Sequence, residues 1–297
     1  MYFQRMGRVG RGGGAAPEEA REIAYYREYL AREGRFPRFT QVLLETRTDC
    51  NRRCAFCPQG HARRPFQQMS WEVFRRVIDE LVRLEFAGRI ALFMTNEPLL
   101  DERLPEMLAY ARAASPRFFL DINTNGMILS VDKVDQLLAA GLDNLNIQDY
   151  RTPEDRAAGR KSPHIAAVLA AYGANPKLDY VERSTQEVLS SRAGHVPKTA
   201  GGPVACFCSF PFRKLAVAPD GEVVLCCMDY HYQERLGNVM AAGLEEIWQG
   251  PGFRAFREAL LKRERPGLCA KCDECSYPPV SAKARAVGWL KRALDGR

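Results

Sequence analysis

Along the middle of the chain, short runs of apolar and β-branched residues alternate with longer stretches of helical periodicity. The short runs predict strands at residues 40–46, 89–94, 118–122 and 142–147, with weaker candidates at 178–182 and 187–189. The longer stretches predict helices at residues 17–32, 70–86, 101–114, 131–140 and 163–172. This alternation favours a parallel sheet, so the predicted fold class is α/β with a partial (β/α)6 TIM-like barrel.

The pattern changes after a Gly/Pro-rich linker at residues 198–203. Two apolar runs, 214–218 and 222–226, flank Pro219-Asp220-Gly221 and predict a β-hairpin. Helices are predicted at 244–248 and 253–262, and a basic amphipathic helix at 282–294 reads as a solvated, packed end. The expected units are a tag remnant and Gly-rich lead (1–16), an N-terminal helix (17–39), a barrel core (40–197), a small β-hairpin/helix auxiliary domain (198–280) and a basic C-terminal helix (281–297).

The composition is that of a globular protein, because 46% of the 297 residues are hydrophobic and 27% are charged. No apolar run approaches the roughly 18 residues that a membrane span needs, so we expect no membrane partner. The net charge of +7 permits an anionic partner, but arginine is spread along the whole chain, so we expect no nucleic acid. Ten cysteines without a signal peptide indicate reduced, metal-binding or reactive thiols and a cytoplasmic protein.

The first cysteine group, Cys50, Cys54 and Cys57, has the spacing C-x3-C-x2-C and directly follows the first predicted strand. Three thiolates so close together can hold one side of a cubane iron–sulfur cluster and leave one iron open. Zinc would ordinarily take a fourth ligand from a second segment. With Phe56 in the position before Cys57, the loop resembles the signature of the radical S-adenosylmethionine (SAM) superfamily, C-x3-C-x-aromatic-C.

The resemblance implies that these cysteines hold a [4Fe–4S] cluster whose open iron binds SAM. The reduced cluster of that family cleaves SAM to a 5′-deoxyadenosyl radical, which takes a hydrogen atom from the substrate. Family-like companions follow the later predicted strands, where barrel active sites lie. They are Asn96 and Glu97, then Asn123, Thr124 and Asn125, then Asn146 and Gln148, and finally Ser190 and Arg192.

The resemblance implies a SAM-binding role for these companions. Glu97 would pair with the SAM ammonium group, the Thr124-Asn125-Gly126 segment would reach the ribose hydroxyls, and Arg192 would clamp the carboxylate. Each also has a plain structural interpretation, as a turn before a helix, an Asx turn or an ordinary loop arginine.

The second cysteine group lies in the last third of the chain. Cys208, Cys226, Cys269 and Cys272 form C-x17-C…C-x2-C around the predicted hairpin and helices, which resembles the auxiliary-cluster region called SPASM or, when shortened, twitch. The resemblance implies one auxiliary [4Fe–4S] cluster, and a structural zinc ribbon is the alternative. Cys206 and Cys275 are alternates if the register differs.

Cys227 is left with two interpretations, a small buried apolar residue or a hydrogen donor to a substrate radical. We expect a radical SAM enzyme that acts on a small polar metabolite, such as a sugar, aminocyclitol or aminoglycoside. The outcome would be dehydrogenation or epimerisation, with a flavodoxin- or ferredoxin-type electron donor. The alternatives are a SPASM-type maturase of a ribosomal peptide and, outside the enzymes, an iron–sulfur electron carrier or zinc-ribbon binding module.

Overall fold

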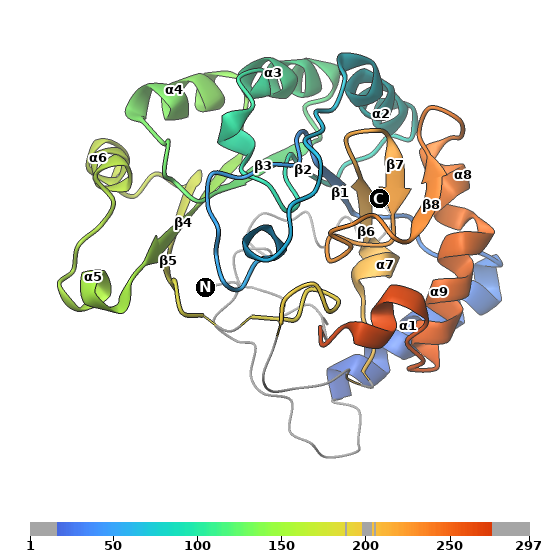
Figure 1. Cartoon of the computed structure of the whole chain (residues 1–297). Coiled ribbons are helices and arrows are strands. Elements are labelled where there is room, and N and C mark those ends of the chain that lie inside the picture. Colours follow the sequence, from blue (N-terminus) through green and yellow to red (C-terminus); the bar gives the residue numbers. More distant parts are fainter. Residues whose placement is uncertain (1–16, 188, 198–203, 205, 275–297) are drawn as a thin grey trace.

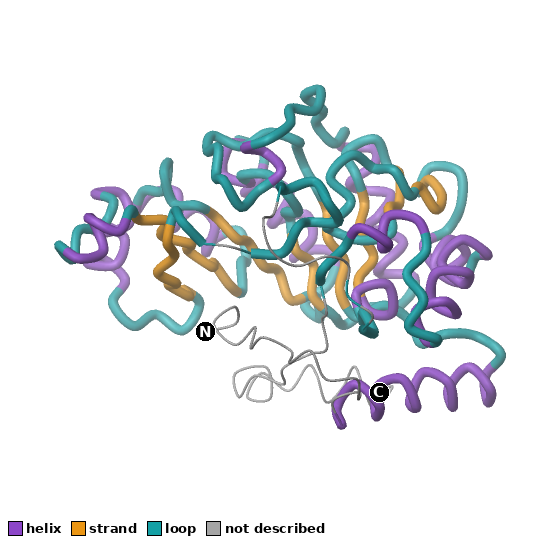
Figure 2. The backbone as a smooth tube through the Cα atoms, turned by 60° about the horizontal axis from the view of Figure 1, so that its bottom comes forward, coloured by secondary structure: helices purple, strands orange, loops and turns teal. Residues whose placement is uncertain are grey.

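One eight-stranded sheet runs through the part of the chain that the computed structural model describes, residues 17–187, 189–197, 204 and 206–274. The strand order is β5-β4-β3-β2-β1-β6-β7-β8. The strands lie in one curved row (Figure 2), which is the arrangement of a partial barrel. The α/β class predicted from the alternation is therefore confirmed.

The first five strands lie in chain order and pair in parallel, so their carboxyl ends meet at one edge of the sheet. Their bounds are β1 Gln41–Leu44, β2 Arg89–Ala91, β3 Phe119–Thr124, β4 Asn144–Arg151 and β5 Leu178–Ser184. The intervening helices are α2 Trp71–Arg83, α3 Leu104–Ala114, α4 Val131–Ala139, α5 Pro153–Ala157 and α6 Pro163–Tyr172. In Figure 1, α2, α3, α4 and α6 lie along the outer side of the curved sheet.

The two faces of the sheet carry different kinds of side chain. Val42 of β1 and Ile90 of β2 are fully buried in the main hydrophobic core beneath the helices. Alternate positions along each strand point to the opposite, inner face. There Arg89 Nε donates to Asp121 Oδ2 (3.0 Å) and Asn144 Nδ2 donates to Asp121 Oδ1 (2.7 Å). The inner face is therefore polar, whereas the helix-facing side forms the core.

Strand β6 (Lys214–Val217) pairs in parallel with the other edge of β1, and Gln41 lies opposite Lys214. β7 (Glu222–Val224) and β8 (Arg235–Asn238) continue the sheet in the antiparallel sense. The predicted β-hairpin is thus confirmed, and Gly221 takes the positive φ of 83° that its turn requires. The sixth parallel strand of the sheet comes from this hairpin, so the sheet crosses the expected boundary between core and auxiliary domain.

The remaining helices are α1 Pro17–Glu33, α7 Phe210–Arg213, α8 Leu244–Gln249 and α9 Pro251–Leu261. α1 packs against the auxiliary region, where the rings of Tyr26 and Phe212 are 4.4 Å apart. Arg257 of α9 is fully buried and donates to the carbonyls of Pro211 (2.7 Å) and Trp248 (2.6 Å), and burial lowers its pKa to about 9. These contacts tie the N-terminal helix and the last helices into one packed layer.

Helix α2 shows how the core reaches the auxiliary region. Ser70 caps its start by accepting a hydrogen bond from the Val73 amide (3.2 Å). Glu80, on the same helix, is nearly buried, and its Oε1 accepts from the amide of Leu244 (2.9 Å) at the start of α8. Gly243, the N-cap residue of α8, has no side chain that could cap the helix. The Glu80 side chain of α2 takes this role instead.

Several predicted details differ from the structure. Glu187 and Leu189 lie outside any strand, and their loop crosses to the auxiliary region. β2 ends at Ala91, earlier than expected. The short elements α5, α7 and β8 were not predicted, because they are too short to show a period. The linker 198–203 and the helix expected at 282–294 lie outside the described residues. No helix in the described ranges is both long and apolar enough to cross a membrane.

Replacing Glu80 with Ala should lower the free energy of unfolding by about 1–2 kcal/mol, because the buried Leu244 amide loses its acceptor. Urea denaturation measures the effect. Arg83→Ala, on the exposed side of α2, is the control and should change stability by less than about 0.5 kcal/mol. Equal effects of the two substitutions would contradict the cap.

Candidate active site between two cysteine groups

The first cysteine loop follows β1 and winds tightly around Cys54. The Cys57 amide donates to the Cys54 carbonyl (3.1 Å), the Gly60 amide donates to the Cys57 carbonyl (2.9 Å), and a short 3-10 turn, Pro58–Gly60, follows. The three thiols are partly exposed and close enough to influence one another. Burial, with the neighbouring thiols, raises the pKa of Cys50 to about 11, so binding a cluster as thiolates releases protons.

Phe56 is buried beneath this loop and stacks on Tyr150 at the end of β4, with ring centroids 5.1 Å apart. Arg52 lies over the same Tyr150 ring at 5.4 Å and donates to the Tyr150 carbonyl (3.3 Å). The aromatic position of the motif therefore anchors the cysteine loop to a strand end on the far side of the barrel mouth.

Glu97 joins the ends of β2 and β3. Its Oε1 accepts from the Thr124 hydroxyl (2.7 Å) and the Leu99 amide (3.1 Å), and its Oε2 accepts from the Asn125 amide (2.8 Å). Burial raises the pKa of Glu97. Glu97 is therefore in direct contact with the Thr124-Asn125-Gly126 segment. Because a carboxylate offers about four acceptor positions, these contacts leave little capacity for a SAM ammonium group.

Asn125 joins this cluster to the cysteines. Its Nδ2 donates to Asn51 Oδ1 (2.8 Å) and lies 3.7 Å from Cys50 Sγ. The segment expected to contact the SAM ribose therefore adjoins the cysteine loop.

The other amide side chains at the strand ends keep unused hydrogen-bonding groups. Asn96 Nδ2 and Asn123 Oδ1 are buried and have no hydrogen-bond partner among the described residues. Gln148 Nε2 donates to Asn146 Oδ1 (2.5 Å) on the inner face. A buried polar atom without a partner is costly, so these atoms indicate a place for a polar ligand.

Ser190 and Arg192 lie on the auxiliary side of the mouth, and Arg192 is also close enough to Tyr150, on which the first cysteine loop stacks, to act on its pKa. Arg192 Nη1 is 3.5 Å from Met228 Sδ, and the Ser191 amide donates to Asp273 Oδ1 (2.6 Å). Arg192 also lowers the pKa of Glu274, which burial raises. Arg192 therefore lies next to the second cysteine group, and its contact with the SAM carboxylate stays a prediction.

The four thiols of the second group come from three segments and are all buried. Cys208 precedes α7, Cys226 follows β7, and Cys269 and Cys272 lie in and after the 3-10 helix Gly267–Lys271. Burial, with the other thiols, raises the pKa of Cys226, and also raises that of Cys269 to about 12 and of Cys272 to about 11. In the described ranges, no three His, Cys, Asp or Glu side chains group tightly enough for a single metal ion.

This donor set fits an iron–sulfur cluster, because it consists of thiols alone and a cubane takes each thiolate on a different iron. Cys227 differs from the four, since it is only partly buried. Cys206 is buried and its Sγ lies 2.8 Å from Arg265 Nη2. Cys275 lies outside the described residues.

A buried ion pair that the sequence analysis missed lies between the two cysteine groups. Glu45, just after β1, pairs with Arg64 and accepts from the Tyr232 hydroxyl. Burial, with Glu45, raises the pKa of Tyr232 far above its usual range. These residues carry no spacing motif, and only their partners in the fold identify them.

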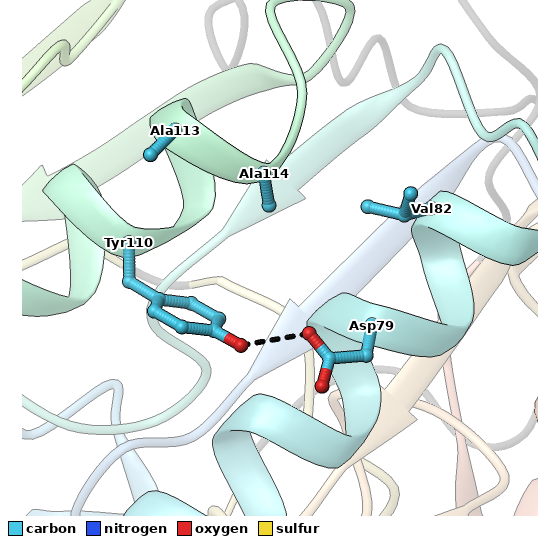
Figure 3. A pocket seen from close by; sticks show the side chains of 5 residues that line it. All are labelled: Asp79, Val82, Tyr110, Ala113 and Ala114. Atoms are coloured by element: carbon cyan, nitrogen blue, oxygen red, sulfur yellow. Dashed lines mark hydrogen bonds between the residues drawn. The ribbon is translucent and has the colours of Figure 1, made fainter.

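A shallow hollow of about 350 Å³ lies on the outer surface between α2 and α3. Figure 3 shows the Tyr110 hydroxyl directed at Asp79, to which it donates (2.7 Å). The hollow belongs to the helix layer and not to the inner face, so it is separate from the site.

Comparison with known families identifies both halves of the site. Residues 44–148 match the model of the radical SAM superfamily, and residues 206–276 match SPASM, an iron–sulfur cluster-binding domain. The chain belongs to the radical SAM superfamily and carries a SPASM domain. It is therefore an enzyme that uses SAM and iron–sulfur clusters.

Individual relatives of this radical SAM enzyme match different shares of the chain. An S-adenosyl-L-methionine-dependent 2-deoxy-scyllo-inosamine dehydrogenase from Niallia circulans is 28% identical over 245 residues, which cover 80% of this chain and 94% of the relative. A crystal structure of BtrN in complex with AdoMet and 2-DOIA superposes with a TM-score of 0.71 at 26% identity, over 80% of this chain and 94% of that one. A PqqA peptide cyclase from Xanthomonas euvesicatoria pv. vesicatoria is 31% identical over only 44% of this chain and 37% of the relative.

Replacing Gly60 with Ala should displace the first cluster of this radical SAM enzyme, because a Cβ there would lie 2.4 Å from the Cys54 carbonyl oxygen. We expect anaerobically reconstituted protein to fall from roughly eight to roughly four iron per chain, since each cubane holds four. Iron analysis measures the cluster content. EPR of the reduced protein measures the change in the cluster signal on adding SAM, which should be lost. Ala55→Ser, at an exposed position of the same loop, should keep the full iron content.

Replacing Cys226 with Ala should remove the auxiliary cluster and leave roughly four iron per chain, whereas Cys227→Ala should retain roughly eight. The two neighbouring thiols form a matched pair, because Cys226 is buried with the other three thiols and Cys227 is partly exposed. Iron and sulfide analysis distinguish them. The opposite pattern would show that the ligand register is shifted by one residue.

Proposed function

We propose that this radical SAM enzyme dehydrogenates a carbinol carbon of a small, hydroxyl-rich metabolite of the aminocyclitol, sugar or aminoglycoside class. The observation that carries the proposal is the match to a named aminocyclitol dehydrogenase over 80% of this chain and 94% of the relative. The peptide cyclase, by contrast, matches over only 44% of this chain and 37% of its own length.

The polar inner face supports a substrate of this kind. Asn123 Oδ1 lacks a partner among the described residues, and the Asn146–Gln148 pair lies beside it on the neighbouring strand. Amides that both donate and accept suit a ligand with several hydroxyl groups.

The proposed roles follow from the positions of the residues. Cys50, Cys54 and Cys57 would hold the SAM-binding cluster, and Phe56 would fix their loop on Tyr150. Glu97, with Thr124 and Asn125, would orient the strand ends beside SAM, and Asn96, Asn123, Asn146 and Gln148 would offer hydrogen bonds to SAM or substrate. Ser190 and Arg192 would line the auxiliary side. When bound, the cluster and SAM supply the radical that takes hydrogen from the substrate.

Cys208, Cys226, Cys269 and Cys272 would hold one auxiliary [4Fe–4S] cluster, which would accept the electron that the substrate radical loses, together with a proton to solvent, as the ketone forms. Two outcomes remain as alternatives. Epimerisation would require Cys227 to return a hydrogen atom, and its partial exposure allows this. Maturation of a ribosomal peptide is less well supported, because the matched cyclase shares less than half of this chain.

We further propose a flavodoxin- or ferredoxin-type electron donor and a cytoplasmic location. Arg53 and Arg63 are exposed on the first cysteine loop, and their charge suits an acidic donor protein. We retain the division into a lead (1–16), helix (17–39), core (40–197), auxiliary domain (198–280) and C-terminal helix (281–297), with the shared sheet between core and auxiliary domain.

Incubating reduced, reconstituted enzyme with SAM and 2-deoxy-scyllo-inosamine should give a ketone and 5′-deoxyadenosine in equal amounts. Mass spectrometry measures both products. In deuterated water, label at a carbon of an otherwise unchanged alcohol would instead indicate epimerisation, and Cys227→Ser should abolish that label. SAM cleavage without conversion of this or related polyols would contradict the proposed substrate class but not the radical SAM chemistry.

A further inference from the structure

A buried polar network joins the first cysteine loop to the auxiliary segment that begins at Cys226. Glu45 is fully buried, and the Arg64 side chain is only 6% exposed. Glu45 Oε1 pairs with Arg64 and accepts from the Thr95 amide (3.0 Å), while Oε2 accepts from the Tyr232 hydroxyl. Both carboxylate oxygens are therefore satisfied by groups from separate parts of the site.

Arg64 makes further contacts to the same auxiliary segment. Its Nη1 donates to the Tyr230 carbonyl (2.9 Å), and its guanidinium lies over the rings of Tyr230 (4.4 Å) and Tyr232 (4.9 Å). A planar fork can make these contacts together, whereas a lysine ammonium cannot. Arg64 thus links the end of the cysteine loop to two tyrosines of the auxiliary segment.

A second set of contacts runs beside the first. Gln59 Nε2 donates to the carbonyls of Thr48 (2.7 Å) and Thr95 (2.8 Å). The Tyr230 hydroxyl lies 3.2 Å from Gln59 Oε1 and donates to the Ala62 carbonyl (2.9 Å). Gln59 is two residues from Cys57, so the auxiliary segment directly contacts the loop that carries the first cysteines.

The auxiliary segment is itself closed by hydrogen bonds, which makes it a short and stiff connection. Asp229 accepts from the amides of Gln233 and Glu234 (both 2.8 Å), and the Leu225 amide donates to the Glu234 carbonyl (3.1 Å). Cys226 lies at the start of this closed loop and Tyr232 near its end. A displacement of Tyr232 would therefore be transmitted to Cys226.

We propose that Arg64, together with Glu45 and Tyr232, is a positioning group that fixes the SAM-binding cluster relative to the auxiliary cluster. This proposal rests on the proposed function, because it assumes that both clusters serve one reaction. Arg64 touches neither cysteine group directly but holds the loop of one and the segment of the other. Without it, the clusters would still form, and their relative position would vary.

The experiment compares Tyr232→Phe and Arg64→Lys with matched controls on the outer surface. Tyr232→Phe removes one hydroxyl from Glu45, and Tyr110→Phe removes one hydroxyl from Asp79 in the outer hollow shown in Figure 3. Arg64→Lys replaces the planar guanidinium that pairs with Glu45 by an ammonium group of the same charge. Arg112→Lys makes the same replacement in the ion pair with Asp143 on the outer surface. All four proteins are reconstituted anaerobically and compared at equal iron content.

The first measurement needs no substrate. With both clusters reduced, the spin–spin interaction between them is recorded by EPR, and we expect a broadened, weaker interaction in Tyr232→Phe and Arg64→Lys only. The second is the yield of oxidised product per 5′-deoxyadenosine with 2-deoxy-scyllo-inosamine, which should fall at least about threefold in these two variants, a change of at least about 0.7 kcal/mol at 25 °C.

Unchanged EPR interaction in both network variants would overturn the proposal, whatever the substrate. If the wild-type enzyme converts neither 2-deoxy-scyllo-inosamine nor related polyols, the proposed function fails, and the EPR comparison still decides the role of Arg64. Arg64→Lys could instead lose the iron of the first cluster while Tyr232→Phe keeps the wild-type EPR interaction. That result would show that Arg64 only stabilises its own loop, which also contradicts the proposal.

Discussion

The pairing of β6 with the free edge of β1 is the contact on which the site depends. Because the auxiliary hairpin adds to the strand that leads into the first cysteine loop, both cysteine groups share one hydrogen-bonded framework. Glu45 follows β1 at this junction, and its amide donates to the Val217 carbonyl (3.0 Å). These backbone hydrogen bonds tie the two cysteine groups to one sheet, and the side-chain contacts of Arg64 add to them.

Charged side chains inside the barrel are tolerated because each pairs with an opposite charge or accepts or donates hydrogen bonds. The Arg89–Asp121 and Arg64–Glu45 pairs are held by further hydrogen bonds from Asn144 and the Thr95 amide. Removing one partner of such a pair leaves an uncompensated buried charge, which is strongly destabilising. The atoms of Asn96 and Asn123 that lack partners among the described residues stand out against this background, and they lie where the strand ends meet.

Burial and reactivity separate the two cysteine groups. The auxiliary thiols are buried, as a cluster that exchanges only electrons allows, whereas the first three are partly exposed, as a cluster that must bind SAM requires. The same contrast sets Cys227 apart from its neighbour Cys226. One backbone position therefore separates a buried thiol from a partly exposed one.

The sequence alone determined the α/β class, the hairpin and the two cysteine groups, because apolar periodicity, turn residues and ligand spacing are local properties. It also placed Glu97 and Asn125 at strand ends. It could not show that Arg192 lies against the auxiliary region, or that Glu45, Arg64 and Tyr232 meet, since these residues are far apart in the chain and carry no spacing signal. Only the tertiary structure decided those contacts, because burial makes each charge or hydroxyl take whichever partner the packed fold brings within hydrogen-bond distance.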